Sequence, residues 1–198
     1  MIQATSTIAA LLYGTSLCLL ALLHWKRPEL SVVRNAVSEY GTGSTATLFR
    51  LNATIGSIAA LLLAVGFYLS PDIARSTSIA LFLVLMIVAR TGVSIWPTDA
   101  EGHPVTASGR IHLLFAIVSF TFTYMAVTRI ADVLPAVDHW PGFQTSWSPF
   151  RWLVSASLAA TVATMLRPLR AWFGLAERAF LILTPLFFLT AALWMATR

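Results

Sequence analysis

The chain has 198 residues, of which 58% are hydrophobic and only 11% are charged, and its formal net charge is +5. Soluble domains contain roughly 45–50% apolar and about 25% charged residues, so this composition excludes an ordinary soluble protein and indicates an integral membrane protein. The length allows several helices of about 20 residues joined by short connections, so we expect a single transmembrane domain over residues 1–198.

The excess of basic residues does not indicate nucleic-acid binding. Lys and Arg stand singly at the ends of apolar runs, whereas a nucleic-acid site gathers them in a patch with aromatic residues between them. Anionic membrane lipid is the partner that this distribution favours. Cys18 is the only cysteine and lies in an apolar run, which excludes an intrachain disulfide and a cysteine-based metal cluster.

Six apolar runs predict an all-α fold, an integral membrane bundle of six transmembrane helices. The expected spans are residues 8–25, 51–69, 77–96, 111–130, 152–166 and 179–197. We interpret the first as a retained span. A signal peptide needs basic residues before its apolar run and a small-residue cleavage site after it, and this segment has neither. The fifth contains Ser155, Ser157, Thr161 and Thr164; small and hydroxyl residues favour close helix packing, so we expect this helix inside the bundle.

The positions of the basic residues predict the orientation in the membrane. Eight fall in the first, third and fifth connections and four on the other side: Lys26, Arg27, Arg34, Arg50, Arg110, Arg167, Arg170 and Arg178 against Arg75, Arg129, Arg151 and Arg198. Because positive charge stays on the cytoplasmic side, we expect an inner-membrane protein with both termini on the outer, periplasmic side. The tryptophans fall near span ends, and Trp140, Trp147 and Trp152 are predicted interfacial anchors.

The stretch 88–112 gathers more ionisable residues between two spans than any other. Arg90 lies six residues before Trp96, which places its Cα about 9 Å inside the helix end at a rise of ~1.5 Å per residue. A charge at that depth needs a carboxylate partner, a wet cavity or a path to the interface. Two interpretations are open: Arg90 pairs with Glu39 or Asp99 as an ion pair or ligand clamp, or it is a packing arginine that extends to the interface. The candidate polar site comprises Glu39, Arg90, Asp99, His103 and His112.

Carboxylates and imidazoles are ligands that zinc or iron requires, but this stretch lacks a specific metal spacing such as H-E-x-x-H, so we predict no metal site. The alternative is a polar loop in which Asp99 closes the turn after Pro97 and Ser108 caps the next helix. His24 and His112 lie at the same expected interface, where imidazoles can ligate haem or a chlorophyll-type pigment. Interfacial histidines without a cofactor are commoner, so no cofactor is predicted and haem or pigment ligation is the lesser alternative.

Several short segments resemble a known family. They are Arg34–Gly41 (RNAVSEYG), Phe49–Asn52, Gly92 with Trp96–Asp99, His112, and Gly174–Arg178 (GLAER). Together they resemble the prokaryotic multi-pass membrane family called domain of unknown function 998. More distantly, the Ser38-Glu39 segment and His112 are similar to the six-span DRAM-type family, some of whose relatives act in lipid handling, although Glu39 stands where aspartate is expected. The resemblance implies a six-helix bundle and no activity.

The function predicted from these features is that of a non-catalytic binding or accessory component of the inner membrane, which holds lipid or another membrane complex. The interfacial tryptophans and small-residue helices favour this interpretation, and no catalytic spacing favours an enzyme. The alternative is a lipid-active enzyme or small transporter with a polar site at the inner interface. Membrane lipids, and in the accessory role another membrane complex, are the expected partners.

Overall fold

A computed structural model describes residues 1–99, 102, 104–137, 140 and 144–198. Within this part the chain contains six α-helices and no strand, as the apolar runs predicted. The helices are α1 (Ile2–Lys26), α2 (Ala46–Tyr68), α3 (Ser76–Ile95), α4 (Ala107–Val133), α5 (Trp147–Ala163) and α6 (Phe173–Ala196). Short 3₁₀ segments lie between them, among which η1 (Val37–Gly41) and η5 (Arg167–Trp172) are the longest.

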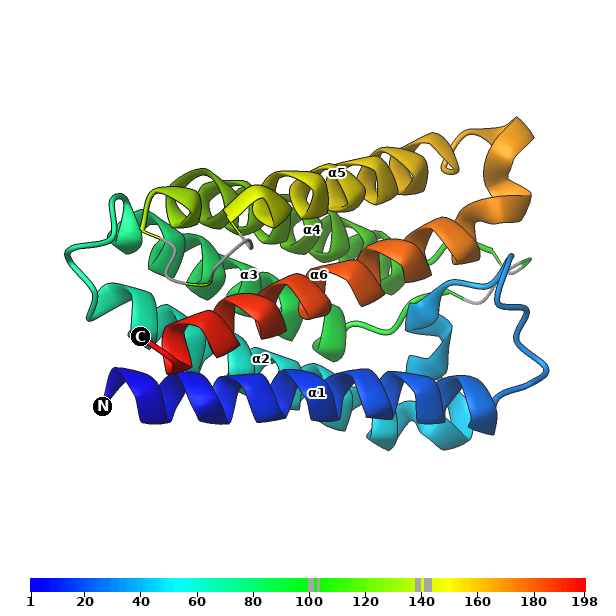
Figure 1. Cartoon of the computed structure of the whole chain (residues 1–198). Helices are drawn as coiled ribbons and strands as arrows, with labels where there is room; N and C mark the ends of the chain where they lie inside the picture. Colours follow the sequence, from blue (N-terminus) through cyan, green and yellow to red (C-terminus); the bar gives the residue numbers. More distant parts are fainter. Residues whose placement is uncertain (100–101, 103, 138–139, 141–143) are drawn as a thin grey trace.

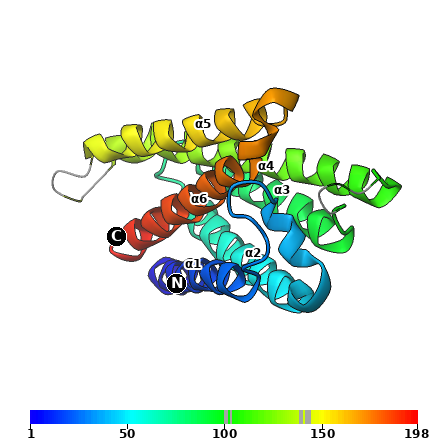
Figure 2. The ribbon, with the colours of Figure 1, turned by 90° about the vertical axis from the view of Figure 1, so that its right-hand side faces the viewer.

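The six helices run lengthwise along one axis, and consecutive helices run in opposite directions, so both termini lie at the same end (Figure 1). Each helix packs against the next, and α6 returns to pack against α1, which closes the bundle. When the bundle is viewed from the end opposite the termini, α6 lies between the α1–α2 pair and α5 (Figure 2). We call the end with residues 27–45, 96–99 and 104–106 the loop end and the opposite end the terminal end.

Five of the helical segments are long and apolar enough to cross a membrane: Ile2–Lys26, Gly43–Tyr68, Ser76–Ile95, Ala107–Ala136 and Arg167–Ala196. All six helices expose large apolar side chains on their outer faces, including Leu11, Leu61, Val88, Leu114, Leu153 and Leu193. Water would make such a surface unstable, whereas lipid accepts it. The chain is therefore a multi-pass membrane protein, and five of the six predicted spans satisfy both criteria.

The remaining predicted span, residues 152–166, differs from its prediction. Helix α5 has 17 residues, which corresponds to about 25 Å of helix against the ~30 Å of a hydrocarbon core. The helix lies at the edge of the bundle against α4 and α6, not in its interior. Its hydroxyls bond to its own backbone, with Ser157 Oγ donating to Val154 O at 2.8 Å and Thr161 Oγ1 to Ser157 O at 2.8 Å. These two hydroxyls are satisfied locally and do not require a neighbouring helix, whereas Ser155 Oγ also contacts Tyr124 Oη of α4 at 3.2 Å.

The predicted tryptophan anchors occupy three different environments. Trp147 is 0% exposed and packs edge-on against Phe187, with ring centroids 5.6 Å apart. It belongs to the core and is not an interfacial anchor, because it begins α5 on the face that meets α6. Trp140 donates a hydrogen bond to Thr197 Oγ1 at 3.0 Å. Trp152 is exposed, with the Arg151 guanidinium 5.3 Å from its ring centroid.

Candidate functional site

The connection between α1 and α2 folds over the loop end of the bundle and is held there by Arg178 of α6. The Arg178 side chain is buried, and all three of its guanidinium nitrogens donate hydrogen bonds, with five acceptors within reach. The acceptors are His24 Nε2 at 2.7 Å, Val32 O at 2.9 Å, Asn35 O at 2.6 Å, Gly174 O at 3.0 Å and Tyr40 Oη at 2.9 Å. We call residues 27–45 the cap segment.

Two buried carboxylates strengthen this attachment. Glu177, which precedes Arg178 on α6, accepts a hydrogen bond from the backbone N–H of Val37 at 2.6 Å. Glu39 lies within the cap segment, where its carboxylate accepts from Asn35 Nδ2 and from the backbone N–H of Ala36 at 2.9 Å. Each carboxylate thus fixes backbone of the cap segment, which would otherwise lack regular hydrogen bonding.

Helix α6 begins directly against the cap segment because residue 174 is glycine. A Cβ at this position would overlap the carbonyl oxygen of Asn35 and press on the backbone of Arg34. The close approach lets the backbone N–H of Leu175 donate to Val33 O at 3.1 Å. The motif Gly174–Arg178 therefore supplies the contact point, the carboxylate and the guanidinium that hold the cap segment.

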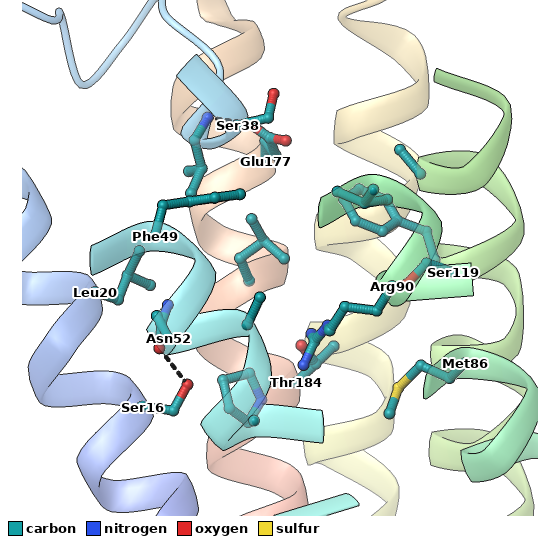
Figure 3. Close-up of a pocket in the computed structure, with 18 of the residues that line it drawn as sticks. Ser16, Leu20, Ser38, Phe49, Asn52, Met86, Arg90, Ser119, Glu177 and Thr184 are labelled. Atoms are coloured by element: carbon teal, nitrogen blue, oxygen red, sulfur yellow. Dashed lines mark hydrogen bonds between the residues drawn. The ribbon is translucent and has the colours of Figure 1, made fainter. Parts of the chain in front are cut away.

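Beneath the cap segment lies a cavity of about 120 Å³ lined by η1 and by α1, α2, α3, α4 and α6. Such a volume has room for several water molecules or for one compact chemical group. Most of its walls are apolar, formed by residues such as Leu20, Phe49, Met86, Phe120 and Leu181. Polar side chains enter from several helices, as Figure 3 shows for Ser16, Asn52, Arg90, Ser119 and Glu177.

Arg90 projects from α3 across the cavity toward α2 (Figure 3). A Cβ at Gly56 of α2 would lie 2.8 Å from Arg90 Nη1, so the missing side chain makes room for the guanidinium. No hydrogen bond or ion pair joins this guanidinium to any residue in the described part of the chain. The sequence interpretation that paired Arg90 with Glu39 or Asp99 is therefore wrong, because both carboxylates are bonded elsewhere.

Two α1 residues that line the cavity, Tyr13 and Ser16, differ in their hydrogen bonding. The hydroxyl of Tyr13 is buried and has no partner among the described residues. Ser16 Oγ, one turn further along α1, donates to Asn52 Oδ1 of α2 at 2.7 Å (Figure 3). Ser16 therefore holds α1 and α2 together, whereas Tyr13 lines the cavity with a hydroxyl that no described residue bonds.

His112 lies between the cavity and a smaller pocket at the loop end. Its Nδ1 donates to the carbonyl of Trp96 at 2.8 Å, and since a carbonyl only accepts, Nδ1 carries the proton. The smaller pocket shares Ser38, Phe49, Val93 and His112 with the cavity and continues to Arg50, Pro97 and Thr98. The shared side chains separate the cavity from the bundle's end.

Asp99 belongs to a helix cap and not to the cavity. Its carboxylate accepts from the backbone N–H of Thr106 at 2.9 Å and from Thr106 Oγ1 at 2.7 Å. Thr106 in turn caps α4 by accepting from the N–H of Gly109 at 3.0 Å. The predicted cap Ser108 instead donates to Pro97 O at 3.1 Å. The cap is two residues earlier than predicted because α4 starts at Ala107.

Of the five predicted polar-site residues, the structure brings only Arg90 and His112 to one cavity. Glu39 fixes the cap segment, Asp99 caps α4, and His103 lies outside the described residues. Within the described part of the chain, no three His, Cys, Asp or Glu side chains lie close enough to hold a metal ion.

Both ring nitrogens of His24 are engaged within the protein. Its Nδ1 donates to Leu20 O at 2.6 Å and its Nε2 accepts from Arg178. Haem or pigment ligation by His24 or His112 stays a prediction.

Three important residues were absent from the predicted site: Tyr13, Glu177 and Arg178. The Gly174–Arg178 segment was recognised as a motif, but its partners in the cap segment lie more than 130 residues away in sequence, and no spacing rule joins them. Tyr13 gave no signal, because a tyrosine in an apolar run is an ordinary core residue.

A family model described as "Protein of unknown function (DUF998)" matches residues 7–195 of the chain. No curated protein and no solved structure matches it.

Proposed function

The chain belongs to this family, as its short motifs predicted, and we propose that it is a non-catalytic membrane protein that holds part of a lipid or other amphiphile in its central cavity. The observation that carries the proposal is the cavity itself, which is lined by five helices and has mainly apolar walls with a few polar side chains. This combination is typical of small-molecule sites. Lipid surrounds the outer faces of the helices and is therefore the ligand in greatest supply.

Binding accounts for these residues better than catalysis does. The acidic groups that acid–base chemistry needs are committed to holding the backbone: Glu177 bonds Val37, Glu39 bonds Ala36, and Asp99 bonds Thr106. Ser16, a cavity hydroxyl, is bonded to Asn52. A reacting group must be within hydrogen-bond reach of a base, and these contacts favour stable positioning of a ligand.

The proposal is tested by filling the cavity. Ala116 of α4 lines it, so Ala116→Phe places a ring in the space that a ligand would occupy. Leu114, two residues earlier, is exposed to lipid, and Leu114→Phe is the matched control. We expect lipid at near-stoichiometric amounts by mass spectrometry after mild-detergent purification of the wild type and Leu114→Phe, and its loss from Ala116→Phe. Equal lipid in all three proteins, or lipid in none, would contradict the proposal.

A small transporter is the second candidate function. The pocket that continues from the cavity past Phe49 and His112 to Arg50 supports it, because this pocket leads to the bundle's end. Transport predicts that Phe49→Ala speeds the flux of a ligand across proteoliposomes. A binding protein predicts ligand retention and no flux in either form.

We propose that the loop end faces the cytoplasm of an inner membrane. Arg178 is buried and fully bonded, so its charge does not determine orientation, but the other seven basic residues predicted on that side still outnumber the four at the terminal end. Cysteine labelling from outside intact cells at Gln3 and at Arg167 tests this orientation, and the former alone should react. The accessory role in a membrane complex stays a prediction.

A further inference from the structure

Arg90 and Tyr13 bring polar groups into the cavity that the protein does not use. The guanidinium has neither a hydrogen bond nor an ion pair with the described residues, and the Tyr13 hydroxyl is fully buried without a partner. Both side chains line the same cavity. Buried polar groups are ordinarily hydrogen-bonded, so two unused donors on side chains that line one cavity require an explanation.

Among the described residues, no acidic side chain forms an ion pair with this positive charge. Glu177 is the acidic side chain of the described residues that lines the cavity, and it is bonded at the cap segment to Val37. In Figure 3 it lies toward η1, apart from the end of the Arg90 side chain. A charge within a bilayer is costly unless it is paired or solvated. The cavity therefore carries a localised positive charge on α3.

We propose that the cavity binds a compact anionic group, a carboxylate or a phosphate, held by the Arg90 guanidinium and the Tyr13 hydroxyl. The planar guanidinium presents a fork of N–H donors that matches the oxygens of both groups. The inference rests on the proposed function, since it names the ligand chemistry of the same cavity. The anion has two possible sources, an anionic lipid or fatty acid and a free anion from solution.

The dimensions of the site restrict the ligand to a small head. A cavity of about 120 Å³ accommodates a carboxylate or phosphate but not a whole lipid. The apolar side chains beside it, including Leu17, Met86 and Phe188, suit the first carbons of an attached chain. Gly56 preserves the space that the guanidinium occupies.

The experiment compares four probes on lipid-stripped protein in neutral detergent: phosphatidylglycerol, oleate, inorganic phosphate and zwitterionic phosphatidylcholine. Binding is measured by the ligand-dependent rise in unfolding temperature. Because hydrogen bonds to charged groups contribute about 1.5–3 kcal/mol, we expect Arg90→Gln to weaken anion binding about 10- to 150-fold. Tyr13→Phe removes only the hydroxyl and should weaken it about 2- to 10-fold. Arg110→Gln removes an exposed charge and is the control that should bind normally.

Each outcome decides a separate question. Binding of inorganic phosphate identifies a free anion as a source, whereas binding of phosphatidylglycerol or oleate alone identifies a lipid. Failure of the wild type to bind any of the three anions, or equal binding by Arg90→Gln and Arg110→Gln, overturns the anion site. If phosphatidylcholine binds independently of Arg90 but is lost in Ala116→Phe, the proposed lipid-holding function stands and this inference fails. If phosphate binds through Arg90 while no lipid co-purifies, the anion site stands and the proposed lipid-holding function fails.

Discussion

Arg178 and Arg90 are the same kind of side chain within one helical bundle, yet their surroundings are opposite. Arg178 donates hydrogen bonds from all three guanidinium nitrogens to the cap segment, His24 and its own helix. Arg90 faces the cavity without a hydrogen bond or ion pair to the described residues. A charge whose guanidinium nitrogens all bond to the protein stabilises the fold, whereas a charge without such bonds is available to a ligand. The comparison therefore separates structural from functional arginines by their bonding and not by their burial.

The largest expected difference in stability is between the variants that remove the charge of Arg178 and of Arg90. Arg178→Met leaves His24, Tyr40 and three carbonyls unpaired, so we expect the free energy of unfolding to fall by about 3–5 kcal/mol. Arg90→Met breaks no bond to the described protein and should change it by less than about 1 kcal/mol. Reversible unfolding in mixed micelles measures both values on lipid-stripped protein. Similar losses in the two variants would mean that Arg90 has a structural role.

Substituting the glycine beside each arginine should show the same contrast: the loss of stability should be larger beside Arg178 than beside Arg90. Gly174→Ala forces a methyl group against the backbone of Asn35, and such overpacking costs about 1–3 kcal/mol. Gly56→Ala meets only the end of the Arg90 side chain, 2.8 Å away, and a flexible end can move aside. We expect nearly unchanged unfolding but weaker anion binding in Gly56→Ala. A stability loss equal to that of Gly174→Ala would show that the Arg90 guanidinium is rigidly held.

Substitutions of His24 and His112 should show a smaller difference in stability loss. His24→Phe leaves Arg178 Nε–H without its acceptor, which should cost about 1–3 kcal/mol. His112→Phe removes one neutral hydrogen bond to Trp96 and should cost about 0.5–1.5 kcal/mol. Unfolding measurements on both variants, with His112→Gln as a polar control, test the difference. A larger loss in His112→Phe would place a structural role at the cavity wall.

The sequence predicts the helices well because each apolar run must cover its backbone polar groups within the bilayer, and only a helix does so locally. The prediction from sequence fails where the environment of a side chain depends on another helix. Trp147 has the sequence signs of an interfacial anchor, and only the contact with Phe187 reveals a core residue. Hydroxyls in α5 indicate close packing, but Ser157 and Thr161 bond to their own turn.

The candidate site can be predicted only in part, for the same reason. Arg90 was identified by its depth in an apolar run, which is a local property. Its lack of a partner is a three-dimensional property, because Glu39 and Asp99 are each bonded by backbone N–H groups near them in sequence. The Glu177 and Arg178 contacts join the last helix to the cap segment, and a pattern of spacings does not contain such pairings.

The smallest predicted effect has the opposite sign from the others. Tyr13→Phe removes a buried hydroxyl without a partner among the described residues, so ligand-free protein should gain up to about 1 kcal/mol of stability. With a saturating anion the difference should narrow or reverse, because the wild type alone uses the hydroxyl. Unfolding of both proteins with and without inorganic phosphate or phosphatidylglycerol measures this change. Tyr13→Phe that is less stable even without ligand would show that the hydroxyl already serves the fold, and Arg90 would then be the sole donor available to an anion from this pair.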